Sequence, residues 1–149
     1  MRHLRLSSVC ALAIMLVACG SGSSSSNNVG GNWSATLSSK GATVVAFTAL
    51  LTQGSSNAIS VTNLTFTMAT TCFTSGTTAS STLGANGTMN GAGGNTFQMT
   101  LQSGTSNLNG TNMLTLQGTL ANGTISGTWN ETGTGTGCTG TGNFSMFKM

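Results

Sequence analysis

The feature that most constrains the fold of this chain is a strict alternation of apolar and small polar residues, which begins near Gly31. In residues 96–102, 114–120 and 124–130, apolar residues or glycine occupy one parity, and threonine, glutamine, serine or asparagine occupy the other. Successive side chains of a β-strand point to opposite faces, so this period of two residues predicts strands with one buried and one solvated face. Helical spacing does not persist anywhere, and the sequence therefore predicts an all-β fold.

The alternation divides the chain into about eight expected strands with short connections. They lie at residues 31–39, 43–53, 58–69, 81–89, 95–103, 112–121, 124–132 and 141–148. Short consecutive strands joined by tight turns favour a small up-and-down antiparallel barrel, with a β-sandwich as the alternative. The interior of an eight-stranded barrel is either filled by side chains or holds one small ligand.

Local signals refine the expected strands. Within residues 58–69 the apolar parity changes, which predicts a β-bulge near Thr62-Asn63. Asn122-Gly123 lies between two alternating runs and has the sequence typical of a type I′ hairpin turn. Asn86-Gly87 leaves two alternatives, a continuous strand over residues 81–89 or a turn that splits it.

The first eighteen residues have the order of a secretory signal peptide. Arg2, His3 and Arg5 form a basic region, and an apolar run follows at residues 9–18. This run is too short to cross a bilayer, which requires about 20 apolar residues. We therefore expect residues 1–18 to be a cleaved signal peptide.

The end of the apolar run, Leu16-Val17-Ala18-Cys19, resembles the lipobox of bacterial lipoproteins. The resemblance implies cleavage before Cys19, diacylglycerol on its thiol and attachment to the bacterial cell envelope. Gly20, rather than aspartate, follows the cysteine, which resembles the pattern sent to the outer membrane. The expected organisation is a signal peptide at 1–18, a lipidated cysteine with a flexible Ser/Gly linker at 19–29, and a β domain at 30–149.

Removal of the signal peptide leaves very few charged groups. The mature chain keeps Lys40, Lys148 and Glu131, with no histidine, aspartate or arginine. Two lysines cannot form the basic stripe that nucleic-acid binding requires. General acid–base catalysis requires a titratable pair, and a metal site requires several ligands. We therefore expect no enzymatic activity, no cofactor, no metal site and no nucleic-acid partner.

The cysteines separate into three groups. Cys10 is lost with the signal peptide and Cys19 carries the lipid, which leaves Cys72 and Cys138 in an oxidising compartment. A pair of cysteines there is expected to form a disulfide, worth about 4 kcal/mol in the loop-closure model. In an eight-stranded meander the connections that hold these two cysteines lie at the same end, so the disulfide would tie two loops across one mouth.

The first strand opens with Gly31-Asn32-Trp33. This tripeptide resembles the G-x-W of lipocalins and related calycins, in which the tryptophan packs across the closed end of the barrel. A calycin-like barrel implies a small apolar ligand. Its expected lining residues are Trp33, Phe66, Phe97 and Trp129.

Two functions remain open for a lipid-anchored, non-enzymatic envelope protein. One is a binding module that holds a small apolar ligand inside the barrel. The other is a structural or adhesive module without such a ligand, in which the Thr/Asn/Gly-rich surface meets surface polymers or proteins.

Overall fold

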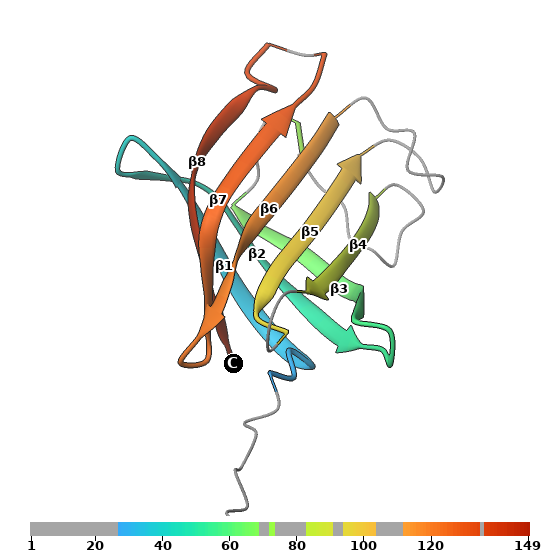
Figure 1. The fold of residues 1–149 in the computed structure, drawn as a ribbon. Helices are drawn as coiled ribbons and strands as arrows, with labels where there is room; N and C mark the ends of the chain where they lie inside the picture. The colour runs from blue at the N-terminus through green and yellow to red at the C-terminus, as the bar shows by residue number, and fades with distance from the viewer. Residues whose placement is uncertain (1–26, 69–71, 74–82, 91–93, 104–111, 135) are drawn as a thin grey trace, which may run out of the picture.

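The chain folds into an all-β, closed antiparallel barrel (Figure 1). This computed structural model describes residues 27–68, 72–73, 83–90, 94–103, 112–134 and 136–149. The strands are β1 (Gly31–Ser39), β2 (Ala42–Gln53), β3 (Ala58–Met68), β4 (Leu83–Asn90), β5 (Thr96–Ser103), β6 (Asn112–Ala121), β7 (Thr124–Thr132) and β8 (Gly140–Lys148). Each pairs with its neighbour in the sequence, and β8 closes the barrel on β1. The expected up-and-down barrel is confirmed.

Backbone geometry accounts for the local signals in the sequence. Asn86-Gly87 lies within β4, which is one continuous strand. Asn63 has a φ of 49°, and the pairing of β2 with β3 slips between Thr48 and Leu50, so the predicted bulge is confirmed. Asn122 and Gly123 have φ values of 51° and 75°, and positive φ at both central residues is the geometry of a type I′ turn.

The two ends of the barrel differ in what lies there, and we name them accordingly. The entry end is where the chain enters β1 at Gly31; the β6–β7 turn and the C-terminus lie there too (Figure 1). The disulfide end is where the connections after β3 and β7 meet. The β1–β2 turn at Lys40-Gly41 also lies at the disulfide end. In the described part of the chain, no helix is long and apolar enough to cross a membrane.

Apolar side chains fill the inside of the barrel. The largest with less than 2% exposure are Trp33, Phe47, Phe97, Leu37, Leu51, Leu64, Met89, Met99, Leu101, Leu114, Leu116 and Ile125. They come from every strand except β8, which contributes the buried Phe144 and Met146. The opposite parity of the strands is largely Thr, Ser, Asn and Gln, as the alternation predicts.

Glycines in the wall give the large rings their space. A Cβ atom on Gly118 would lie 2.9 Å from Cζ of Phe144, and one on Gly140 would lie 2.9 Å from Cη2 of Trp129. These separations are shorter than van der Waals contact, so both rings lie directly against the backbone of a strand. Large and small residues therefore interdigitate across the barrel.

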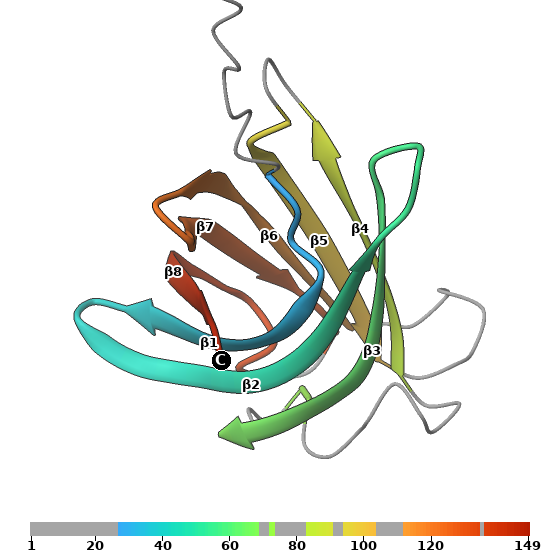
Figure 2. The same ribbon diagram turned by 90° about the horizontal axis from the view of Figure 1, so that it is seen from below.

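The barrel wall opens between β3 and β4. Their described pairing consists of Ala58 with Thr88, Ile59 with Gly87 and Ser60 with Asn86, all near the entry end. Beyond these pairs the two strands diverge towards the disulfide end (Figure 2).

Candidate functional site

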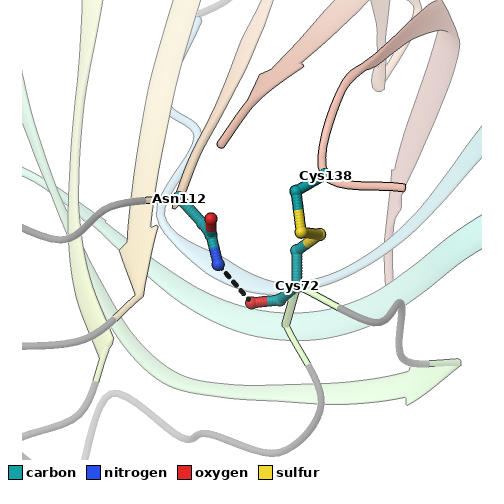
Figure 3. The surroundings of a disulfide bond; sticks show 3 residues. All are labelled: Cys72, Asn112 and Cys138. Carbon is teal, nitrogen blue, oxygen red and sulfur yellow. Dashed lines mark hydrogen bonds between the residues drawn. A yellow bond between two sulfur atoms is a disulfide. The ribbon is translucent and has the colours of Figure 1, made fainter. Parts of the chain in front are cut away.

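Cys72 and Cys138 are joined in a disulfide at one end of the barrel (Figure 3). Their Cα atoms are 5.5 Å apart, and the two residues are 6% and 4% exposed. Nδ2 of Asn112, at the start of β6, donates a hydrogen bond to the carbonyl oxygen of Cys72 at 3.4 Å. The predicted disulfide is confirmed, and it links the connections after β3 and β7 at the end where they were expected to meet.

The disulfide holds an aromatic side chain over the interior. Phe73 directly follows Cys72 and is 3% exposed. The centroid of its ring lies 5.6 Å from that of Phe66, which in turn lies 5.9 Å from the ring of Phe47. Cys72 and Phe73 thus belong to the buried core at the disulfide end.

Glu131 is the chain's only carboxylic acid side chain, and it is 5% exposed. It lies on β7 and pairs with Leu114 of β6 and Gly140 of β8. Its parity is that of Ile125 and Trp129, both buried, and this shared parity is the signal in the sequence that could have identified its inward direction. The described residues contain no group of three His, Cys, Asp or Glu that could hold a metal ion.

The two tryptophans expected to line a ligand site occupy different parts of the barrel. Trp33 is 1% exposed at the entry end, and its Nε1 donates to the carbonyl oxygen of Val29 at 2.7 Å. Trp129 is 4% exposed, and its Nε1 donates to the carbonyl oxygen of Ser38 at 3.0 Å.

The two phenylalanines of the expected ligand site make separate contacts. Phe97 is fully buried and its ring centroid lies 6.3 Å from that of Phe144. Phe66 is partly buried and contacts the rings of Phe47 and Phe73. In the described chain, the ring pairs therefore join Phe66 and Phe97 to residues outside the expected set. Their role in lining a ligand stays a prediction.

The outer surface of β4–β7 carries a regular array of uncharged polar side chains, which we call the polar grid. One row of paired residues crosses the strands as Asn86, Thr100, Thr115 and Asn130, and the next as Thr88, Gln98, Gln117 and Thr128. Thr88 accepts a hydrogen bond from Nδ2 of Asn90 at 3.1 Å. The other grid side chains make no hydrogen bond within the described chain, so they are available to an outside partner.

Two shallow hollows lie on the polar grid. The β6–β7 hollow, about 250 Å³, is lined mainly by Thr115, Gln117, Thr128 and Asn130. The β4–β5 hollow, about 160 Å³, is lined by Asn86, Gly87, Thr88, Gln98 and Thr100. Typical small-molecule sites are mostly apolar and occupy about 300–1,000 Å³. The grid therefore has the character of an extended contact surface rather than of a pocket for one molecule.

Comparison with known proteins gives no family assignment, because no family model, curated protein or solved structure matches the chain. The signal peptide expected at residues 1–18 and the lipobox cysteine, Cys19, lie outside the described residues. The resemblance to bacterial lipoproteins and to calycins therefore rests on the motifs in the sequence.

Proposed function

We propose that this chain is a lipid-anchored, non-enzymatic protein of the bacterial cell envelope, attached through Cys19 and directed to the outer membrane. Its barrel acts as an adhesive module whose outer surface meets an uncharged envelope polymer. The lipobox supports the anchor. The disulfide supports an oxidising compartment, because such bonds rarely persist in the cytosol.

The observation that carries the proposal is the contrast between the inside of the barrel and its outside. Inside, wall glycines lie directly under the rings of Phe144 and Trp129, and the inward side chains are almost completely buried. Outside, the polar grid presents hydroxyl and amide groups over four adjacent strands. Available hydrogen-bonding groups therefore lie on the surface, whereas the interior is packed with apolar side chains.

The chemistry of the polar grid indicates the class of polymer. Threonine, asparagine and glutamine side chains both donate and accept hydrogen bonds, as the hydroxyl groups of a glycan do. The grid carries no charge, so it gives no electrostatic attraction to an anionic polymer. Single contacts of this kind are weak, and a repeating polymer that meets several of them gains affinity by multivalency.

The second candidate function is the binding of a small apolar ligand inside the barrel. The observation in its favour is that the buried interior is almost entirely apolar, with Glu131 as its one charged residue in the described chain. Native mass spectrometry of the protein purified from its own host separates the two candidates. Repeatedly ligand-free protein supports the adhesive module, and a co-purified apolar molecule supports the ligand-binding barrel.

Co-sedimentation with insoluble envelope glycan tests the adhesive module itself. The double variant Gln98→Glu and Gln117→Glu places two like charges on paired residues of the grid. Its matched control, Thr48→Glu and Thr65→Glu, does the same on β2 and β3, away from the strand pairs with β4. Each change from glutamine to glutamate removes the amide N–H donors, so we expect the grid variant to lose at least about ten-fold in binding and the control to bind as the unmodified protein does. Equal binding by both variants would show that the polar grid does not bind the glycan.

A further inference from the structure

The C-terminal residues form an apolar rim on a surface that is otherwise mostly polar. Phe147 is 50% exposed and Met149 is 67% exposed. Met68, at the disulfide end, is the one other large hydrophobic residue with comparable exposure in the described chain. Two exposed apolar side chains with a lysine between them are therefore concentrated at the entry end.

This apolar rim lies beside the point where the chain enters the barrel. The backbone N–H of Met149 donates to the carbonyl oxygen of Asn32 at 2.9 Å. A Cβ atom on Gly31 would come within 3.3 Å of Nζ of Lys148, so the lysine side chain lies over the first residue of β1. Phe147 pairs with Ser34 of β1 and with Thr124 next to the β6–β7 turn. Figure 1 shows the C-terminus and the start of β1 at the same end.

We infer that the barrel rests with its entry end on the bilayer, with Phe147 and Met149 in the headgroup region and the disulfide end facing away. This inference depends on the proposed anchor at Cys19. The Ser/Gly-rich linker expected between Cys19 and the barrel would have a mean reach of under about 20 Å on random-coil scaling, which would hold the entry end near the lipid surface. At that effective concentration even a weak surface contact determines which end of the barrel faces the bilayer.

Apolar exposure, rather than charge, distinguishes the two ends. Lys148 at the entry end is matched by Lys40 at the β1–β2 turn of the disulfide end, so anionic lipid attracts both ends similarly. Phenylalanine and methionine side chains gain free energy when they leave water for the interface. Exposed at the entry end, they favour the orientation in which that end touches lipid.

Two alanines beside tight turns allow a matched test of this orientation. Ala121 precedes the β6–β7 turn at the entry end, and Ala42 follows the β1–β2 turn at the disulfide end. Each is changed to cysteine in the full lipidated chain, labelled with an environment-sensitive fluorophore and reconstituted in phosphatidylcholine–phosphatidylglycerol vesicles. We expect the label at position 121 to shift to the blue and to be quenched by aqueous iodide at least about three-fold less than the label at position 42.

Variants of the apolar rim test whether Phe147 and Met149 cause the protection of the label at position 121. Phe147→Ser with Met149→Ser should abolish the protection at position 121 while the protein still sediments with vesicles. Met68→Ser, which removes an exposed apolar side chain at the disulfide end, should leave the protection unchanged. Equal quenching of the two labels in vesicle-bound protein would overturn this inference alone. Protein that does not sediment with vesicles would instead overturn the anchor on which the inference depends.

Discussion

The indole Nε1 of Trp129 on β7 donates to the carbonyl oxygen of Ser38 on β1 at 3.0 Å, so its side chain spans the intervening strand β8. The ring passes over Gly140 and Gly142, where β8 has no side chains. One aromatic residue thus links three consecutive strands at the place where the barrel closes. The small residues at the start of β8 are a requirement of this packing.

Gly142→Ala should therefore destabilise the barrel. Its Cβ atom would overlap the backbone carbonyl oxygen of Ser38 and lie 2.6 Å from Nε1 of Trp129, and the forced displacement should cost about 1–3 kcal/mol, measured as a lower midpoint of urea unfolding. Gly54→Ala is the matched control, because its Cβ atom would lie 3.6 Å from the carbonyl oxygen of Ala58. The control should change the stability by no more than about 0.5 kcal/mol. Equal midpoints for the two variants would contradict this account of β8.

Removal of the disulfide should lower the free energy of unfolding substantially. The double variant Cys72→Ser and Cys138→Ser removes a crosslink between residues 66 positions apart in the sequence. The loop-closure model assigns such a crosslink about 4 kcal/mol of the free energy of unfolding. Urea unfolding of the variant, with the reduced unmodified protein as the control, measures the loss. The two should unfold at similar urea concentrations, and a double variant as stable as the oxidised protein would show that the bond constrains little.

The stability of the barrel should depend on whether asparagine, glycine or alanine occupies position 122 in the β6–β7 turn. Asn122 has a φ of 51°, which asparagine and glycine tolerate and alanine disfavours. Asn122→Ala should cost about 1–2 kcal/mol, and Asn122→Gly should stay within about 0.5 kcal/mol of the unmodified protein. Thermal unfolding of the two variants measures the difference. A loss of the same size in both would point to the asparagine side chain rather than to the backbone conformation.

Much of the fold could be predicted from the sequence because each strand buries one face. The alternation of residues such as Phe97, Met99 and Leu101 with threonine and glutamine specifies strand, direction of side chains and approximate bounds at once. The change of parity near Asn63 specified the bulge, and Asn122-Gly123 specified a tight turn. In an up-and-down meander these signals also place Cys72 and Cys138 at one end, because every second connection lies there.

The packing at the disulfide end could not be predicted in the same way. Phe73 lies outside the alternating segments, so no pattern indicated that its ring would contact Phe66. The separate ring contacts of Phe66 and Phe97 depend on the register between strands, which parity alone does not give. Glu131 shares the buried parity of Trp129, yet carboxylates are rarely buried, so residue type and parity give opposite predictions for its side chain.

The proposed lipid anchor at Cys19 is tested most directly by metabolic labelling with a radioactive fatty acid in the producing bacterium. We predict that Cys19→Ala abolishes both labelling and recovery in the membrane fraction, because the thiol that carries diacylglycerol is gone. Cys10→Ala, which changes a cysteine within the expected signal peptide, should leave both unchanged. Persistence of lipid labelling and membrane fractionation in the Cys19→Ala variant would contradict the account.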